Sequence, residues 1–234
     1  MYTKSAAFYD AIYAARGKDY VAEAAWLRAA YRTAAKPHAR LLDVACGTGL
    51  HLSQLRADFA VEGLDAEPAM IAIARERLPD VPLQVARMQD FTVSGQFSVV
   101  QCLFGSVAYV RDEAELDATI ARFAAVLEPG GLLVVEPFLQ PDDWDGRTLD
   151  AVFVDRPDFK IARIGLSERY GTTAVLRYDY LVGESAGLSG FSESHAIQLF
   201  TDARYAQAFA RAGLNVRNER SDLFSRGLYI ATRS

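Results

Sequence analysis

The stretch LLDVACGTGLHL, residues 41–52, interrupts an apolar run with two glycines. Gly47 and Gly49 flank a single threonine, Asp43 lies inside the run before them, and Asp65 follows Gly49 by sixteen residues. A glycine-rich turn lets a nucleotide approach backbone that a Cβ would obstruct, and an acid ending the next strand is placed to accept hydrogen bonds from both ribose hydroxyls. These residues predict a nucleoside-binding turn. The alternative is a plain strand-to-helix turn, because a lone GxG arises by chance in many chains.

The charge beside the turn distinguishes two kinds of nucleoside ligand. A dinucleotide-binding fingerprint would place a third glycine at position 52, which is Leu52 in this chain. Asp43 would repel a pyrophosphate, whereas it would attract the sulfonium and ammonium groups of S-adenosylmethionine. The residues therefore favour S-adenosylmethionine, with S-adenosylhomocysteine as its product, over a nicotinamide cofactor.

The cysteines and histidines predict no metal site. Cys46 and Cys102 do not form a CxxC motif, and His38, His51 and His195 are scattered along the chain. We expect two reduced thiols, with Cys102 acting as a small buried residue and not as a nucleophile.

The composition is that of one globular domain acting on small molecules. The chain has 234 residues, of which 51% are hydrophobic and 24% charged, and its net charge is -5. Basic and acidic residues are interleaved, which argues against a nucleic-acid partner. No window is apolar enough for a membrane span, and residues 1–10 lack the order of a secretory signal. We expect a cytoplasmic protein that acts on a small molecule, with no membrane partner.

The elements that would position these residues alternate between strand and helix patterns. Apolar runs predict strands at residues 41–45, 60–65, 82–86, 97–104 and 132–137. Helical spacing and end signals predict helices at residues 18–35, stopped by Pro37, and at 50–58, 67–78 and 112–131. Apolar strands alternating with helices predict an α/β fold, whose doubly wound, mostly parallel sheet is covered on both faces.

The pattern changes after Pro137. Residues 138–200 alternate with period two between turn signals, which predicts an antiparallel β-sheet inserted into the core. A helix at 202–214 and strands at 215–220 and 227–233 would then complete the core. The resulting single domain divides into N-terminal lid helices (1–36), a cofactor-binding core (37–137), the inserted sheet (138–200) and a C-terminal completion (201–234).

Several motifs resemble a known enzyme class. LLDVACGTGLHL, GLDAEPAMIAIAR, ARMQDF and LEPGGLLVVEP resemble the successive motifs of class I S-adenosylmethionine-dependent methyltransferases. More narrowly, FYDAIYAARGKDYVAEA, VVEPF, HAIQLF and SRGLYIA resemble the N,N-dimethyltransferases that act on 3-amino sugars carried by deoxythymidine diphosphate in antibiotic biosynthesis. The resemblance implies a Rossmann-like sheet of seven strands, a homodimer, and methylation of the amine of a nucleotide-linked amino sugar.

The turn and the resemblance together assign residues to the cofactor. Asp43, Gly47 and Gly49 are placed at its methionine end, with Ala45 allowing close backbone approach. Asp65 is placed at the ribose, or else serves as the N-cap of the following helix. The remaining candidates lie on the adenine side or form an apolar wall around the cofactor: Ala66, Met70, Met88, Gln89 and Leu103. For Met70 the alternative is a plain core residue.

Three tyrosines in the N-terminal segment are candidates for a lid over the site. Tyr9, Tyr13 and Tyr20 could exclude water and bring aromatic rings beside a sulfonium or an amine, or they could simply pack the lid helix to the core. We assign Tyr9 and Tyr20 to the cofactor and Tyr13 to catalysis. Lys18 lies among them and could equally be a solvated helix start.

The remaining candidates concern the methyl acceptor. Glu136 ends the fifth core strand and could orient an amine, take its proton or anchor the insertion, and His195 is a further catalytic candidate. Phe104, Phe138 and Arg226 are assigned to the acceptor. A planar guanidinium forks onto phosphate oxygens, so Arg226 suits a pyrophosphate.

Two differences from the family leave alternatives open. Family members carry an acid where this chain has Arg87, and Trp-Trp where it has Phe138 and Leu139. The second difference favours an N- or O-methyltransferase of another small natural product, and the first a member that binds the cofactor without methyl transfer. No Asp-His pair is evident, and because a hydroxyl acceptor needs a base in the transition state, an amine is favoured.

Overall fold

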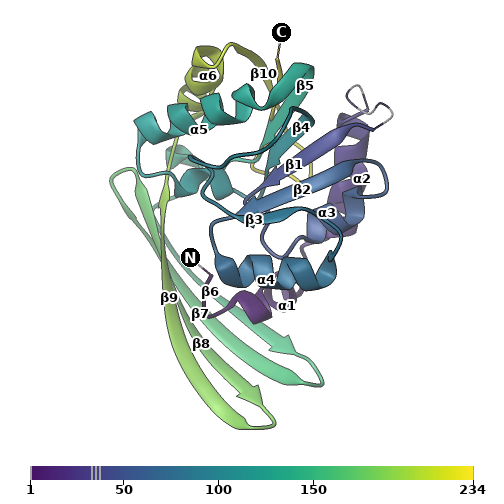
Figure 1. Ribbon diagram of the computed structural model, residues 1–234. Helices are drawn as coiled ribbons and strands as arrows, with labels where there is room; N and C mark the ends of the chain where they lie inside the picture. Colours follow the sequence, from purple (N-terminus) through teal and green to yellow (C-terminus); the bar gives the residue numbers. More distant parts are fainter. Residues whose placement is uncertain (1, 33, 35, 37, 234) are drawn as a thin grey trace.

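Two β-sheets make up the computed structural model, which describes residues 2–32, 34, 36 and 38–233 (Figure 1). A seven-stranded sheet has the order β10-β11-β5-β4-β1-β2-β3, and a four-stranded sheet has the order β6-β7-β8-β9. In the first sheet only β11 runs antiparallel to its neighbours. This arrangement confirms the predicted α/β fold with an inserted antiparallel sheet. The strands are β1 (Arg40–Val44), β2 (Ala60–Asp65), β3 (Leu83–Val85), β4 (Phe97–Cys102), β5 (Leu127–Val135), β6 (Arg147–Asp155), β7 (Phe159–Tyr170), β8 (Thr173–Glu184), β9 (Gly187–Gln198), β10 (Leu214–Glu219) and β11 (Leu228–Arg233).

Helices connect these strands, and several of them begin at a residue whose side chain caps the helix. Asp19 accepts hydrogen bonds from the backbone N–H groups of Val21 and Ala22 at the start of α2, and Pro68 opens α4 as predicted. The helices are η1 (Ala6–Phe8), α1 (Tyr9–Ala15), α2 (Tyr20–Ala30), α3 (Leu50–Leu55), α4 (Pro68–Arg77), η2 (Ser106–Tyr109), α5 (Glu113–Ala125), η3 (Pro141–Asp143) and α6 (Asp202–Arg211).

Two layers of helices cover the seven-stranded sheet. Leu42 packs with residues of α5 and α6 on one face, whereas its neighbour Leu41 packs with residues of α2, α3 and α4 on the other. Every residue of β4 is buried, because a central parallel strand is covered on both sides. The carboxyl ends of the parallel strands therefore meet at one sheet edge, where ligands bind in such folds.

The predicted helices are longer than the observed ones, and two of them extend far beyond the observed C-terminal ends. The helix predicted for residues 112–131 ends at Ala125, because Leu127 already pairs with Phe97 in the sheet and the glycine pair at 130–131 lies inside β5. The helix predicted for residues 18–35 begins at Tyr20 and ends at Ala30. Pro37, its predicted stop signal, lies outside the described residues.

The inserted sheet lies between β5 and α6 in the sequence, as predicted. Figure 1 shows its four long strands projecting from one end of the core. In β8 the side chains alternate, so that Leu176, Tyr178 and Tyr180 are buried on the inner face. Helix α1 packs against β6, and η1 packs against α4. The N-terminal helices and the inserted sheet therefore enclose the space beside the carboxyl edge of the core.

Candidate active site

The turn after β1 arranges its backbone around a carboxylate. Ala45 and Gly47 have positive φ angles of 59° and 56°. Asp65 accepts hydrogen bonds from Gly47 N at 2.9 Å and from Glu67 N at 2.8 Å, one on each oxygen. Burial raises the pKa of Asp65, and these backbone donors oppose the shift. Each oxygen keeps a lone pair for another donor, as a ribose diol requires. The N-cap of α4 is Glu67, not Asp65.

Gly49 has a conformational and packing role in the same turn. Its φ is 78°, and a Cβ there would lie 3.1 Å from Leu78 Cδ1 and 3.3 Å from Ala74 Cβ. It is the N-cap residue of α3, and its lack of a side chain lets the start of α3 approach α4 closely. Its predicted contact with the cofactor therefore has no support in this geometry.

Two adjoining hollows lie beside the turn. One, of about 400 Å³, is lined by the predicted cofactor residues Tyr9, Ala45, Gly47, Asp65, Ala66, Met70, Met88 and Gln89, among others. The other, of about 40 Å³, is lined by Tyr20, Asp43 and Leu103 as well as by residues of the turn. The fold thus gathers these candidates around one elongated space, which we call the cofactor cavity.

Asp43 is buried in this cavity with one unpaired oxygen. Asp43 is 2% exposed, and none of the described residues donates a hydrogen bond to its Oδ2 atom. Burial raises the pKa of Asp43 to about 6. An unpaired buried carboxylate oxygen is costly, and a ligand ammonium group would satisfy it. The donor chemistry of the cavity therefore fits the cation predicted from the sequence.

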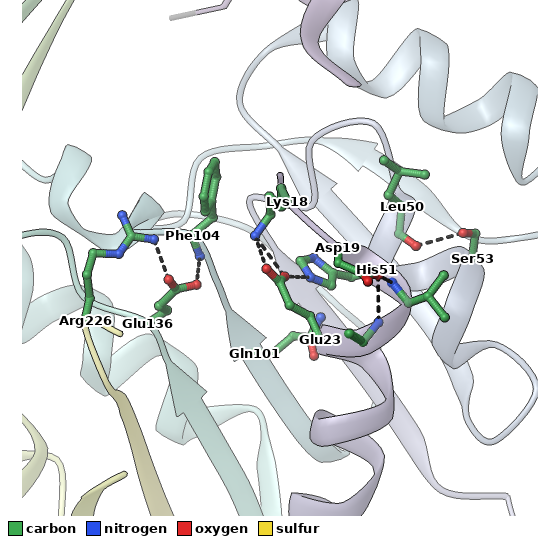
Figure 2. A network of polar contacts seen from close by, with 12 residues as sticks. Lys18, Asp19, Glu23, Leu50, His51, Ser53, Gln101, Phe104, Glu136 and Arg226 are labelled. Carbon is green, nitrogen blue, oxygen red and sulfur yellow. Dashed lines mark hydrogen bonds and ion pairs between the residues drawn. The ribbon is translucent and has the colours of Figure 1, made fainter. Parts of the chain in front are cut away.

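Lys18, Glu23 and His51 form a buried polar network (Figure 2), and Lys18 and His51 line the smaller hollow together with Asp43. Lys18 Nζ donates to the two Glu23 oxygens at 2.6 and 2.8 Å, and His51 Nε2 lies 2.8 Å from Glu23 Oε2. Burial favours a higher pKa for Glu23, but His51 and Lys18 hold the pKa below its usual value. The Lys18 side chain is 7% exposed, and Nζ lies 4.0 Å from the Phe104 ring centroid. Lys18 is therefore no solvated helix start.

A larger hollow of about 560 Å³, which we call the acceptor cavity, lies between the core and the inserted sheet. Its lining includes the predicted residues Tyr13, Phe104, Glu136, Phe138 and Arg226. Six residues line both this cavity and the cofactor cavity: Tyr2, Tyr9, Lys18, Phe104, Ser106 and Tyr109. At this junction, ligands bound in the two cavities would meet, which is the geometry that a group transfer between them requires.

Glu136 holds two groups of the acceptor cavity in place. Its Oε2 accepts a hydrogen bond from Phe104 N at 2.6 Å, and its Oε1 accepts one from Arg226 Nη2 (Figure 2). The residue is 4% exposed, and Phe104 has a positive φ of 58°. Because both carboxylate oxygens are engaged, Glu136 fixes the Phe104 turn and the Arg226 guanidinium.

His195 lies directly behind the junction. Its Nδ1 is 2.9 Å from Tyr109 Oη, and its ring centroid is 4.3 Å from that of Tyr2. Burial, together with the positive charge of Arg163, lowers the pKa of His195 to about 4. The imidazole is therefore neutral near pH 7. It contacts the Tyr109 hydroxyl, and Tyr109 in turn lines both cavities.

Arg87 leaves the cofactor cavity open. Its side chain is 58% exposed at the rim, and Nη2 lies 3.3 Å from Glu115 Oε1. The charge is thus compensated outside the region of Asp43 and Asp65. This removes the structural reason for expecting a member without methyl transfer.

Other kinds of site find no support in the part of the chain that the structure describes. No three His, Cys, Asp or Glu side chains there are placed to hold a metal ion, and none of the helices is sufficiently long and apolar for a membrane crossing. Cys46 and Cys102 are buried, and burial raises the pKa of both thiols. Neither cysteine is activated as a nucleophile.

Comparison with known proteins decides the family. A family model described as a methyltransferase domain matches residues 41–131. The chain is 41% identical to the dTDP-3-amino-3,6-dideoxy-alpha-D-glucopyranose N,N-dimethyltransferase of Streptomyces fradiae, over 96% of this chain and 89% of that protein. The chain belongs to the sugar N-methyltransferases of class I.

Two further relatives agree with this membership. The chain is 39% identical to the dTDP-3-amino-3,4,6-trideoxy-alpha-D-glucopyranose N,N-dimethyltransferase of Streptomyces venezuelae, over 95% of this chain and 94% of that protein. The solved structure of S-adenosylmethionine-bound CalS10, an amino pentose methyltransferase from Micromonospora echinaspora, has a TM-score of 0.87 at 39% identity and covers 97% of both chains. The enzyme is an S-adenosylmethionine-dependent methyltransferase, which confirms the predicted cofactor and reaction class.

The wall of the acceptor cavity includes residues that were not predicted as site residues from the sequence, among them Tyr2, Glu23, Tyr109 and Arg163. Glu23 follows Lys18 by five residues across a helix start, which was the available signal for their ion pair. Arg163 stands between Ile161 and Gly165 on the inner face of β7, where a charged residue in an alternating strand pattern was the signal. Tyr2 and Tyr109 carried no signal in the sequence that distinguishes them from core aromatics.

Proposed function

We propose that this enzyme methylates the amine of an amino sugar carried by deoxythymidine diphosphate. The observation that carries the proposal is the junction between a cavity with an unpaired buried carboxylate and a second cavity with Arg226 on its wall. The relatives' names support the acceptor class, because the two sequence relatives are both dTDP-amino-sugar N,N-dimethyltransferases. A role in antibiotic biosynthesis is supported by CalS10, which is involved in calicheamicin biosynthesis. The cytoplasmic location remains a prediction.

The cofactor residues hold and orient the donor. When bound, S-adenosylmethionine would supply the methyl group: a C–N bond forms as the C–S bond breaks, the electron pair stays on sulfur, and the amine proton passes to solvent water. Asp65 would accept hydrogen bonds from the ribose hydroxyls and Asp43 from the methionine ammonium group, and Met70, Met88 and Gln89 would flank the adenine. Lys18, at the boundary between the cavities, is placed to meet the methionine carboxylate.

Alignment of the reacting groups supplies most of the catalysis. Holding an acceptor nitrogen in line with a methyl group can contribute roughly 7–11 kcal/mol. The Tyr2 and Tyr13 hydroxyls are 2.9 Å apart, and the Tyr13 ring centroid is 4.8 Å from that of Phe104, so these residues close the junction against water. Because its pKa is about 4, His195 does not hold the proton released by the amine near pH 7. It orients the Tyr109 hydroxyl toward the junction instead.

The acceptor's nucleotide end lies toward Arg226. The Arg226 guanidinium is fixed by its hydrogen bond to Glu136. It lies 5.2 Å from the Phe104 ring centroid and 5.9 Å from that of Phe138. A fixed, forked cation matches a pyrophosphate. The apolar ring of Phe138 forms part of the surface against which the nucleotide rests.

The outer face of the inserted sheet forms a homodimer contact. Leu149, Phe153, Ile164 and Leu181 are 73%, 71%, 45% and 53% exposed. The strand register places them together, because Phe153 is opposite Ala162, which is opposite Leu181, while Ile164 is opposite Ala151. Contiguous apolar patches of this kind mark interaction surfaces, and β6 adds an unpaired sheet edge.

Label transfer tests the proposed function. The enzyme is incubated with methyl-labelled S-adenosylmethionine and a panel of dTDP-3-amino sugars, with matched dTDP-sugars that carry a hydroxyl instead of the amine as controls. We expect label only on the amino sugars. Transfer to the hydroxyl compounds, or to none of the panel, would contradict the proposed acceptor while leaving the reaction class intact.

A further inference from the structure

Arg163 is a buried cation on the sheet wall of the acceptor cavity. The residue is 1% exposed and lines that cavity from the inner face of β7. Its Cζ lies 4.4 Å from the Tyr178 ring centroid, and its Nη2 lies 3.2 Å from Asp150 Oδ2. Its Nε has no hydrogen-bond acceptor among residues 2–32, 34, 36 and 38–233.

The carboxylate that faces Arg163 is shared with a second cation. The same oxygen, Asp150 Oδ2, also accepts a hydrogen bond from Arg16 Nη1, just beyond the end of α1. Two guanidinium groups thus share one carboxylate, which leaves positive charge and donor capacity beside the cavity. Buried donors of this kind require an acceptor, because leaving them unpaired costs free energy.

The strands are built to hold this arrangement. Gly165 lies directly opposite both Asp150 and Tyr178 in the strand register. A Cβ at Gly165 would lie 2.2 Å from Asp150 Oδ1 and 2.9 Å from two Tyr178 ring carbons. Only glycine therefore leaves room for the carboxylate and the ring to converge on Arg163.

Arg163 lies on the wall of the acceptor cavity that faces the sugar part of the acceptor. The Tyr178 ring that it contacts lies 5.6 Å, centroid to centroid, from His195, whose partner Tyr109 lines the junction. Arg226 lies against Phe104 and Phe138, which follow core strands, so the two arginines stand on different walls of the cavity. With the amine at the junction and the diphosphate at Arg226, the wall of Arg163 faces the sugar ring between them.

We infer that Arg163 is a specificity-determining residue that donates a hydrogen bond to the C4 hydroxyl group of the sugar ring, beside the amine at C3. This inference rests on the proposed function. The names of the two relatives give a suitable pair of probes, because the 3,6-dideoxy sugar retains the C4 hydroxyl that the 3,4,6-trideoxy sugar lacks. A hydrogen bond to a charged group predicts a preference of about 10- to 100-fold for the sugar with this hydroxyl.

Calorimetric titration of the two dTDP-3-amino sugars tests this inference. The full-length enzyme is loaded with S-adenosylhomocysteine, and Kd is measured for the wild type, Arg163→Met and Arg163→Lys. We expect the wild type to prefer the hydroxylated sugar at least about tenfold, Arg163→Met to bind the two sugars within about twofold, and Arg163→Lys to fall between them. In Arg163→Met, Asp150 keeps Arg16 as partner, so no buried carboxylate is left unpaired.

Several results would overturn the inference. These are a wild type without preference, an Arg163→Met variant that keeps the full preference, or a wild type that binds neither sugar. If Arg163→Met fails to fold, an undiminished preference in Arg163→Lys overturns it. An unchanged Kd for S-adenosylhomocysteine shows that a variant retains its cofactor cavity. Methyl transfer is measured in parallel, because sugars that bind but gain no methyl group contradict the proposed function, and the Kd ratio still decides the role of Arg163.

Discussion

The protonation of Asp43 gives the sharpest prediction for the cofactor cavity. Burial raises the pKa of Asp43 to about 6, and its Oδ2 is without a donor among the described residues. An ammonium ligand binds the ionised carboxylate and not the neutral acid. The affinity for S-adenosylhomocysteine should therefore be constant at higher pH and should fall as the pH drops through about 6.

The magnitude follows from the fraction of Asp43 that is ionised. For a pKa of about 6, the ionised fraction is nearly complete at about pH 7.5 and about one tenth at about pH 5. Kd should rise about tenfold over this interval, which corresponds to about 1.4 kcal/mol. The Asp43→Asn variant should bind more weakly at about pH 7.5, by about 10- to 100-fold, and should lose most of the pH dependence.

Calorimetry with S-adenosylhomocysteine measures these affinities, and Asp65→Asn is the matched control. Ribose hydroxyls do not titrate in this range, so Asp65→Asn should weaken binding at every pH and keep the tenfold change. Because the pKa of Asp43 is raised in the folded state, this residue loses stabilising free energy as the pH rises from about 4 to about 6. Asp43→Asn should consequently have an unchanged or higher Tm at about pH 7.5. An Asp43→Asn variant that retains the full tenfold change would refute the assignment of Asp43 to the ligand cation.

Three other predictions concern the acceptor cavity and the sheet. Arg226→Lys keeps the charge but loses the forked guanidinium. KM for the dTDP-amino sugar should therefore rise about 10-fold or more, while the Kd of S-adenosylhomocysteine stays within about twofold. An equal weakening of both would count against a pyrophosphate contact. Phe153→Lys should convert a dimer into a monomer in light scattering, and an unchanged mass would remove this face as the contact. The pKa of His195 is about 4 when folded against 6.5 when unfolded, so its contribution of about 3 kcal/mol is complete above about pH 6.5 and is lost toward about pH 4. Urea unfolding of His195→Gln should show a flatter pH dependence in that window, and a slope equal to that of the wild type would exclude His195 as its source.

The α/β core was predictable because its signals are local. Central strands carry short apolar runs, such as residues 132–135 in β5, and many turns carry glycine, proline or a capping acid within a few residues. The end of α5 was placed too late for a physical reason that lies outside its sequence. Leu127 pairs with Phe97, so β5 begins before the proline and the glycines that served as the predicted stop signal.

The cofactor cavity was largely predictable, and the acceptor cavity was not. Asp43 and Asp65 lie on the adjacent strands β1 and β2, and Gly47 lies on the turn after β1, so their spacing alone places them at one sheet edge. The acceptor cavity is lined by residues from Tyr2 to Arg226, and nothing in their local patterns indicates that they meet.

The kind of ligand at the β1 turn follows from the amino-acid sequence, because the glycines and the two acids act through backbone geometry and charge over a short stretch of chain. Which ionisable groups are engaged depends instead on how the folded elements pack together. Glu136 has both oxygens occupied, Lys18 is buried against Glu23, and Arg163 is a buried cation that shares its carboxylate. Whether a charged side chain is solvated, paired or available to a substrate depends on burial and on partners far away in sequence, and those are fixed only when the inserted sheet and the N-terminal helices pack over the core.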